Sequence, residues 1–374
     1  MRSMRRCAIL IFPMMNYIYI GCLFYACIWL FTLAGLIIPY RKNDCTSFPS
    51  VTILIVARNE ALRLPLTLAS LQTLDLTGIR AEFIFVNDCS TDDTLTCMQQ
   101  FTSTFPVHIL TIDTKNPLLP GKKDGITRAV AVAHGEIIIM TDADSVPQPR
   151  WVQAMLRHFT PSTVMLLGHV RYAVTGIHSF FANIEALCGS IFTFSWARFN
   201  NAPYCRGANL AFRKDTFIRA KGYEGMPPIA SGDDMFLLQK LRHYGQCRPV
   251  FDQRTFVSTS LHTHVSDHIE QQKRKYAKNF RYEPLHQILF VGGLLFHFLL
   301  FTGLFTNTVH VLHVIAIKTA CEYMIFCIGA SRLGAWNYLP WFPFFILVYP
   351  FEVIIFSLWG AIKGYRWKSD KKIR

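Results

Sequence analysis

The sequence predicts an α/β fold: a mostly parallel sheet sandwiched by helices, with transmembrane helices before and after it. Two observations support this prediction. Within residues 43–283, short β-branched apolar segments alternate with segments of helical periodicity, the pattern of a parallel sheet with helices on both faces. Outside that region, long segments carry almost no charged residues and are long enough to cross the hydrocarbon core of a bilayer.

Four strands are expected in the first part of the central region. Each is a short apolar run that ends in polar residues, and they cover 51–57, 81–88, 107–113 and 136–144. Helical segments are expected after the first three strands, at 61–74, 90–101 and 121–135. The second helix is expected to begin at Ser90 or Thr91, with Asp92 and Asp93 in its first turn.

Polar side chains collect where these strands end. They are Asn59, Glu60, Asn87, Asp88, Asp113, Asp142 and Asp144. In open α/β sheets, ligands bind beyond the carboxyl ends of the strands. The functional site is therefore expected at this edge of the sheet.

The nearly charge-free segments divide the chain into three parts. Residues 1–42 are expected to form an N-terminal membrane anchor, because 17–38 are uncharged and no small-residue cleavage site follows; a signal peptide is the weaker alternative. Residues 43–283 form the central domain. Residues 284–374 are expected to form a C-terminal transmembrane bundle with a basic tail, because three long apolar blocks are rare as buried core helices. These blocks are 286–304, 307–330 and 339–362.

The net charge of +14 does not indicate a nucleic-acid partner. Many of the cations flank the apolar blocks, at Arg41 and Lys42, at 273–281 and in the tail, where lipid headgroups or phosphate-bearing ligands would meet them. The alternative hypothesis, a nucleic-acid-associated membrane protein, is supported by the net charge alone. The eleven cysteines are scattered without a CxxC pair, which indicates reduced thiols and argues against a zinc site or a disulfide framework.

Asp142 and Asp144 are separated by one alanine at the end of the fourth expected strand. Residues two apart in an extended segment project the same way, so both carboxylates can face one divalent ion. Mg²⁺ or Mn²⁺ prefers such oxygen ligands, usually together with substrate phosphates. The alternative is an Asp turn that caps the next element before Pro147.

Several motifs in sequence resemble the family 2 glycosyltransferases in order and spacing, over about residues 50–280. They are VTILIVARNE, FIFVNDCSTDDT, GKKDGITRAV, GEIIIMTDADSVP, RGANLAFRK and ASGDDMFLLQKL. The resemblance implies an inverting glycosyltransferase with a Rossmann-like type A domain, a nucleotide-sugar donor and Mg²⁺ or Mn²⁺ as cofactor. Apolar segments on both sides of the domain are similar to the membrane-bound branch, which glycosylates lipids or extends polysaccharides.

The resemblance implies a role for each residue that matches a donor-binding motif. Ala57, Asn59 and Glu60 would lie along the base and ribose, and Asp88 would hold the uracil or ribose. Asn87 departs from the family, which has an acid there. Either Lys122 or Lys123 would lie near the nucleotide. Asp142 would lie over the ribose and metal, and Asp144 would bind the cation that bridges the diphosphate.

The same resemblance implies the acceptor side of the site. Asp234 matches the family's catalytic base, and Asp233 would orient it or the acceptor. Gly207 and Asn209 match the segment below the acceptor. The family's QxxRW motif is altered: Gln272 aligns with Lys275 and Tyr276 in place of Arg and Trp, whereas an alignment on Gln271 keeps Arg274 and loses the aromatic residue.

The expected function is therefore transfer of a sugar from a nucleotide-diphosphate sugar, a UDP-sugar in the first instance, to a lipid or glycan hydroxyl. A processive polysaccharide synthase and a non-catalytic nucleotide-sugar-binding membrane subunit are the alternatives. We expect an integral, multi-pass protein of the cell inner membrane whose catalytic domain is cytoplasmic, since nucleotide sugars are cytosolic. The arginines at 2–6 and the basic tail conflict with that topology, because the positive-inside rule places both ends in the cytosol as well.

Overall fold

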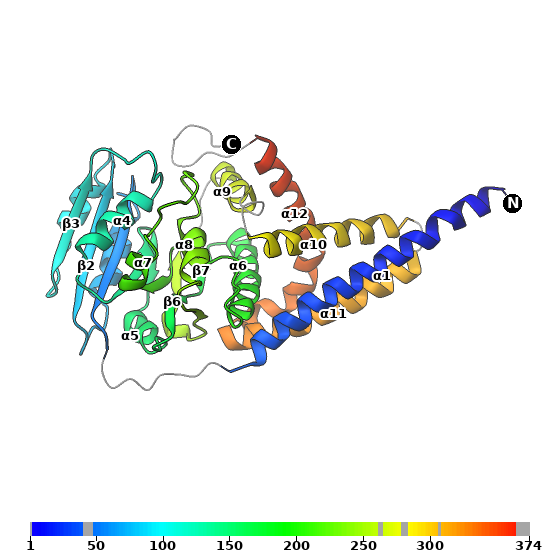
Figure 1. Ribbon diagram of the computed structural model, residues 1–374, viewed down its shortest axis with the longest axis horizontal. Helices are drawn as coiled ribbons and strands as arrows, with labels where there is room; N and C mark the ends of the chain where they lie inside the picture. The colour runs from blue at the N-terminus through cyan, green and yellow to red at the C-terminus, as the bar shows by residue number, and fades with distance from the viewer. Residues whose placement is uncertain (1, 40–47, 261–264, 278–282, 306–307, 364–374) are drawn as a thin grey trace. The chain divides into compact units, whose positions relative to one another are not determined.

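The structure is a computed structural model that describes residues 2–39, 48–260, 265–277, 283–305 and 308–363 (Figure 1). The chain divides into two compact units. Unit 1 comprises Met1–Ile37 and His264–Arg374, and unit 2 comprises Ile38–Thr263. The predicted basic residues Arg41 and Lys42, and the tail 364–374, lie outside the described residues.

Unit 2 is built on a seven-stranded sheet with the order β3-β2-β1-β4-β8-β6-β9. Its strands are β1 Val51–Ala57, β2 Ala81–Asp88, β3 Val107–Ile112, β4 Ile137–Asp142, β6 Thr163–Leu167, β8 Leu210–Arg213 and β9 Gln246–Pro249. Strand β8 runs antiparallel to both its neighbours, while the other pairs are parallel. A second sheet has the order β5-β10-β7, with β5 Ser145–Pro147, β7 Val170–Tyr172 and β10 Val257–Thr259.

The sheet carries helices on its faces, as the alternating sequence pattern predicts. The helices of unit 2 are α2 Leu64–Gln72, α3 Thr94–Gln99, α4 Lys123–Val132, α5 Trp151–Leu156, α6 Ile177–Ala197, α7 Lys214–Arg219 and α8 Asp233–Leu241, with a 3₁₀ turn at Gln253–Thr255. The core beneath them is made of strand residues such as Ile53, Ile55, Phe83 and Phe85, all buried. Because β1 and β2 are covered on both sides, they are buried along almost their whole length.

The predicted fold class is confirmed: a mixed, mainly parallel sheet flanked by helices, with long apolar helices at both ends of the chain. The four predicted strands are present, and β1 and β2 have the predicted bounds. Helix α3 begins later than Ser90 or Thr91, because Asp92 accepts hydrogen bonds from Thr94 and the chain turns there before the helix starts.

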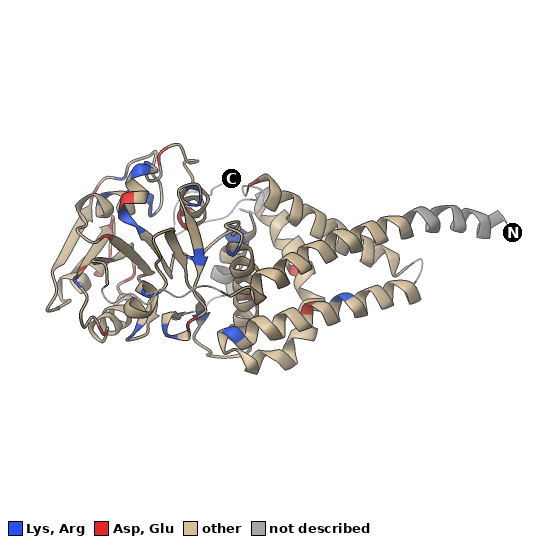
Figure 2. Cartoon of the chain, turned by 60° about the horizontal axis from the view of Figure 1, so that its bottom comes forward, with Lys and Arg blue, Asp and Glu red and all other residues tan. Residues whose placement is uncertain are grey.

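Unit 1 contains the long apolar helices. They are α1 Arg2–Ile37, α10 Pro284–Gly303, α11 Thr308–Leu333 and α12 Phe342–Lys363, together with the shorter α9 Val265–Ala277 and a 3₁₀ segment at Trp336–Trp341. Side chains of α1, α10 and α11 share a small core formed by Ile18, Phe296, Leu300 and Val311. In Figure 2, few residues of these helices, outside the grey part, are coloured as Lys, Arg, Asp or Glu.

Five helices in the described residues are long and apolar enough to cross a membrane: Asn16–Ile37, Ile177–Ala197, Pro284–Gly303, Val309–Leu333 and Trp336–Gly360. Four of them correspond to the predicted apolar blocks. The fifth, within α6, belongs to unit 2, where 61% of its most apolar window is buried. Helix α6 is therefore a buried helix of the sheet unit, which explains why its sequence is apolar.

Candidate active site

The order of the strands changes direction between β1 and β4. From β1 the sheet continues to β2 and β3 on one side, and to β4 and β8 on the other. Such a switch in direction is where open α/β sheets bind ligands. Val56 pairs with Asp142, so the segment after β1, with Asn59 and Glu60, lies beside the end of β4.

The two carboxylates that follow β4 have different partners. Lys122 forms an ion pair with Asp142, while the guanidinium of Arg63 lies 3.9 Å from Asp144 and 3.6 Å from Glu60. Burial, together with the charges of Asp142 and Glu60, raises the pKa of Asp144 to about 6. The site therefore concentrates more negative charge than its own cations neutralise, a condition that a divalent cation relieves.

Helix α8 brings a second acidic pair to the same place. Gly232 precedes it with φ of 84°, a left-handed conformation that favours glycine, and Asp233 and Asp234 form the first turn. Burial and the charge of Asp234 raise the pKa of Asp233 to about 6. Both carboxylates stand at a helix N-terminus, where the dipole favours negative charge.

Lys122 connects the two acidic pairs. Burial lowers the pKa of its ammonium, but the charges of Asp142, Asp233 and Asp144 outweigh burial and raise it above the ordinary value. Lys122 is thus held in its charged form among three carboxylates. The structure brings together the predicted acids of β4 and α8 around one lysine.

The neighbouring Lys123 has a different environment. Its ammonium is buried and donates hydrogen bonds to the carbonyl oxygens of Pro227 at 3.0 Å and Ile229 at 2.8 Å. Burial lowers the pKa of Lys123 to about 8. Lys123 therefore holds the loop that leads into α8. Of the two lysines, Lys122 is the one that pairs with a carboxylate of β4.

Gly121 brings that loop close to the start of α4. Its φ is 74°, and a Cβ at this position would lie 2.1 Å from the carbonyl oxygen of Ala230. Only glycine allows this close approach. The contact places Asp233 near Lys122, although 110 residues separate them in the sequence.

Asp234 is held in a fixed orientation. Its Oδ2 accepts a hydrogen bond from the backbone N–H of Gly207 at 3.0 Å, and its Oδ1 accepts one from Met235 at 2.8 Å. The thiol of Cys205 contacts the backbone carbonyl of Asp234 at 3.3 Å. The carboxylate is only partly buried, so it remains accessible to a hydroxyl group.

Polar atoms at the ends of β2 and β4 lack partners among the described residues. They are the side-chain oxygens Oδ1 of Asn87, Oδ1 of Asp88 and Oγ1 of Thr141, all buried. The other oxygen of Asp88 accepts a hydrogen bond from Lys115 at 3.0 Å. Buried polar atoms are nearly always paired, so this group is suited to a polar ligand such as a nucleoside.

The loops after β1 and β2 are joined next to these atoms. Asn59, with φ of 54°, donates from its backbone N–H to Ser90 at 3.1 Å and accepts from the N–H of Thr91 at 2.8 Å. Asp92 accepts from the N–H of Ala61 at 3.1 Å. Ala57 is buried at the end of β1. These bonds hold the loops after β1 and β2 together beside the candidate site.

Comparisons with known proteins agree with this geometry. The model of glycosyl transferase family 2 matches residues 52–219, and the model of glycosyl transferase family group 2 matches residues 137–362, more than half of the chain. The chain belongs to glycosyltransferase family 2. The matched region is therefore that of a transferase.

Known proteins match this glycosyltransferase over different shares of its length. Probable glycosyltransferase YdaM of Bacillus subtilis (strain 168) is 26% identical over 196 residues, which are 50% of this chain and 46% of YdaM. The chain thus spans about half the length of this curated relative. Mannosyltransferase PcManGT of Pyrobaculum calidifontis, solved with GDP-Man and Mn²⁺, has a TM-score of 0.57 at 16% identity, over 94% of this chain and 99% of that one. S. aureus TarS 1-349 has a TM-score of 0.43 at 13% identity, over 86% and 94%.

In the glycosyltransferase, Asn209 serves as a structural hub. Its side chain is fully buried, donates to the carbonyl oxygens of His169 and Thr255 at 2.8 Å each, and accepts from the indole N–H of Trp151 at 3.0 Å. The two donated bonds use both hydrogens of the Asn209 amide. Asn209 thus positions the turn before β8 that carries Gly207, whose N–H orients Asp234.

The altered QxxRW residues of the glycosyltransferase lie on α9, in unit 1. Gln272 and Tyr276 are buried against neighbouring side chains, and the Tyr276 hydroxyl lies 3.3 Å from that of Tyr349. The Lys275 ammonium lies 4.8 Å from the centre of the Tyr276 ring. Arg274 is half-buried on the same helix. Helix α9 packs on α12, and the structure does not place it relative to the acids of unit 2.

The sequence did not predict the roles of Arg63 and Lys115, which pair with Asp144 and Asp88. Each of them follows the end of a strand by a few residues. Their position close to the acids that cluster at the strand ends was the signal that could have identified them. Lys122 was found only as one of two choices, because adjacent helix residues point in different directions and the sequence does not show which one faces the acids.

Proposed function

We propose that this protein is a membrane-anchored inverting glycosyltransferase that moves a sugar from a nucleotide-diphosphate sugar to a hydroxyl group of a lipid or glycan. The observation that carries the proposal is the Asp234 carboxylate, oriented by the Gly207 and Met235 N–H groups next to the acids around Lys122. The Asp234 carboxylate can deprotonate an acceptor there, while Lys122 and a cation held by the neighbouring acids receive the diphosphate.

The donor occupies the site at the carboxyl ends of β1 and β4. Its base and ribose contact Asn59, Glu60 and Asp88, next to the buried Oδ1 atoms of Asn87 and Asp88, which have no partner among the described residues. Asp142 lies at the ribose and diphosphate side, with Lys122 as the cation beside it. A UDP-sugar is the first donor to test, and a GDP-sugar the second, since PcManGT was solved with GDP-Man.

The carboxylates fit a divalent cation. Asp142 and Asp144 would hold Mg²⁺ or Mn²⁺, since hard oxygen ligands suit these ions and burial among like charges raises the pKa of Asp144. When bound, the cation neutralises charge on the diphosphate as it leaves. PcManGT was solved with Mn²⁺, which supports manganese as the first ion to test.

Asp234 acts as the general base. It accepts the proton of the acceptor hydroxyl as that oxygen attacks the anomeric carbon, opposite the bond to the departing diphosphate. One direct displacement of this kind inverts the anomeric centre. The charge of Asp233 attracts the Lys122 ammonium and helps to hold it between the two acidic pairs. Lys122 stabilises negative charge on the leaving group.

We propose that α1, α10, α11 and α12 anchor the enzyme as a multi-pass protein of the cell inner membrane. Their length and composition support this location. Cytosolic nucleotide sugars require that unit 2 faces the cytoplasm. An acceptor in or at the membrane, a lipid or a growing glycan of the cell envelope, fits this arrangement. In the same proposal, unit 2 is the catalytic domain, α1 is the N-terminal anchor, and α10, α11 and α12 form the C-terminal bundle.

The test is donor turnover by the purified full-length protein in detergent. UDP- and GDP-sugars are offered with membrane lipid extract and Mn²⁺, Mg²⁺ or EDTA, and nucleotide release and product are measured. We expect metal-dependent release that Asp144→Ala abolishes and the exposed-residue control Asp215→Asn retains. A long polymer as product would identify a processive synthase. Donor binding without turnover of any acceptor in the extract would contradict the proposal and favour a non-catalytic subunit.

A further inference from the structure

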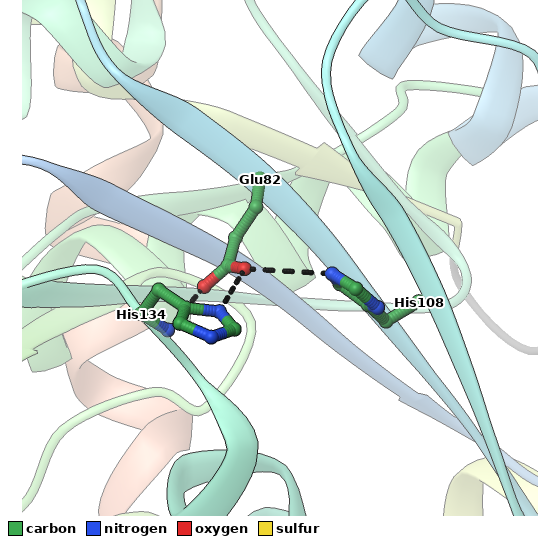
Figure 3. Close-up of side chains that lie close together, drawn as sticks. All are labelled: Glu82, His108 and His134. Atoms are coloured by element: carbon green, nitrogen blue, oxygen red, sulfur yellow. Dashed lines mark hydrogen bonds and ion pairs between the residues drawn. The ribbon is translucent and has the colours of Figure 1, made fainter.

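A second group of metal-ligating side chains lies at the other end of the sheet. Glu82, His108 and His134 place one ligand atom each within 4.8 Å of one another. Figure 3 shows the three side chains turned toward one another. Glu82 is near the start of β2, whereas Asp88 at its end belongs to the active site. At about 3.3 Å per residue, the two positions are roughly 20 Å apart.

The carboxylate of Glu82 is fixed by three donors to one of its oxygens. Oε1 accepts hydrogen bonds from Thr52 Oγ1 at 2.5 Å, from the N–H of His134 at 2.6 Å and from the N–H of Gly135 at 3.2 Å. The Glu82 side chain is only 7% exposed. Because Oε1 is occupied, Oε2 is the oxygen left to face the two imidazoles.

Both imidazoles approach that second oxygen. Nδ1 of His134 lies 3.0 Å from Oε2, and Nε2 of His108 lies 3.8 Å from it. His108 pairs with Ile84 across β2 and β3, two residues from Glu82 and hence on the same face of the sheet. The two rings lie on opposite sides of the carboxylate oxygen in Figure 3.

The position of His134 is set by a glycine. A Cβ on Gly135 would lie 2.3 Å from the backbone nitrogen of Thr52, so the turn after α4 packs directly on β1. The N–H of Gly135 also donates to Thr52 Oγ1 at 3.0 Å. The turn is therefore rigid where it presents His134 to Glu82.

The two distances from Oε2 are near those in the ligand set of a tetrahedral ion, and all three ligand atoms lie within 4.8 Å of one another. Bonds of about 2.0–2.1 Å to zinc separate neighbouring tetrahedral ligands by roughly 3.3–3.5 Å, between the two distances found here. The His108 and His134 side chains are 48% and 81% exposed, so they can adjust and water can supply the fourth ligand. Two imidazoles and a carboxylate are a donor set that zinc takes in proteins.

We propose that Glu82, His108 and His134 bind one divalent transition-metal ion of the zinc class, which ties together the starts of β2 and β3 and the end of α4. Imidazole ligands select zinc, cobalt, nickel or copper over magnesium and manganese. The site is therefore chemically distinct from the all-carboxylate set Asp142 and Asp144. The bound ion stabilises the edge of the sheet, because all three of its ligands lie far from the acids of the active site.

The test uses metal-free full-length protein in detergent, titrated with Zn²⁺ against a chromophoric chelator. We expect His108→Ala/His134→Ala to hold one Zn²⁺ fewer than wild type. At a hundredfold excess over the Kd, Zn²⁺ should raise the Tm of wild type by roughly 5–10 °C more than that of the double variant. Co²⁺ should give wild type a visible spectrum of nitrogen and oxygen ligands that the double variant lacks.

Two control variants separate this site from other ligands. Asp144→Ala removes a carboxylate of the active site and should keep the zinc ion and its effect on the Tm. His178→Ala/His243→Ala removes two other exposed imidazoles of unit 2 and should also keep both. Equal Zn²⁺ stoichiometry and equal Tm shifts in wild type and His108→Ala/His134→Ala would overturn the proposal, and would leave Glu82 as a hydrogen-bond acceptor only.

Discussion

The backbone N–H of Gly207 donates a hydrogen bond to Oδ2 of Asp234 across 3.0 Å, joining segments 27 residues apart. A carboxylate held by backbone groups keeps its orientation without relying on mobile side chains. Since the N–H of Met235 holds the other oxygen, the lone pairs that remain are directed at fixed positions. This is the arrangement that a general base needs before the acceptor arrives.

Asp234→Asn should lower kcat by about 10²–10⁴-fold and leave donor binding nearly unchanged, because the amide cannot accept the acceptor proton. Steady-state rates and donor binding by calorimetry, both with Mn²⁺, check this. Asp215→Asn, a change on the exposed surface of α7, should match wild type in both. A kcat within tenfold of wild type would assign the base to another residue.

Lys122 and Lys123 give a matched pair of neighbouring variants. Lys122→Ala should weaken donor binding and slow turnover, because Lys122 faces the carboxylates of the proposed diphosphate site. Lys123→Ala should lower the free energy of unfolding by about 2–4 kcal/mol, since it removes two hydrogen bonds from a buried ammonium to the carbonyl oxygens of Pro227 and Ile229. Thermal unfolding and donor titration of both variants measure the difference. Exchanged effects would contradict these assignments.

Asn209→Ala separates a positioning role from contact with the acceptor. The change leaves the carbonyl oxygens of His169 and Thr255 and the indole N–H of Trp151 without their partner, so we expect a loss of about 2–4 kcal/mol in unfolding free energy. The Tm in detergent measures it. An unchanged Tm with a raised KM for the acceptor alone would show that Asn209 contacts the acceptor.

Local patterns in the sequence predicted the first half of the sheet well. Strands such as β1 and β2 are continuous apolar runs that end abruptly in polar residues, and buried parallel strands require such runs. The clustering of acids at their ends followed from the rule that parallel strands end at one edge. The pairing of β1 with β4 then puts Asp142 beside the end of β1.

The rest of the site depends on contacts between distant segments. Strand β8 is four residues long and antiparallel, and nothing in its sequence shows that it inserts between β4 and β6. The approach of Gly121 to Ala230, which brings α8 to Lys122, is likewise invisible in the sequence. Glu82, His108 and His134 come from three elements, so no local spacing identified them.

Asp233 should destabilise the folded protein at neutral pH. Burial and the charge of Asp234 raise its pKa to about 6 from 3.8, so the folded state holds this proton more tightly than the unfolded chain does. Ionisation therefore costs stability as the pH rises from about 4 to 6, and the loss persists above pH 6. Asp233→Asn removes this cost, and should stabilise the protein by about 1–3 kcal/mol at pH 7.5.

The Tm in EDTA between pH 4 and pH 8 measures this effect, because a bound cation would alter the charges. We expect Asp233→Asn to melt roughly 3–8 °C above wild type at pH 7.5, with the difference shrinking toward zero as the pH falls through 5. Asp215→Asn should show no such trend, since that carboxylate is exposed. A lower Tm for Asp233→Asn at pH 7.5 would mean that the attraction between Asp233 and Lys122 exceeds the cost of burying the charge.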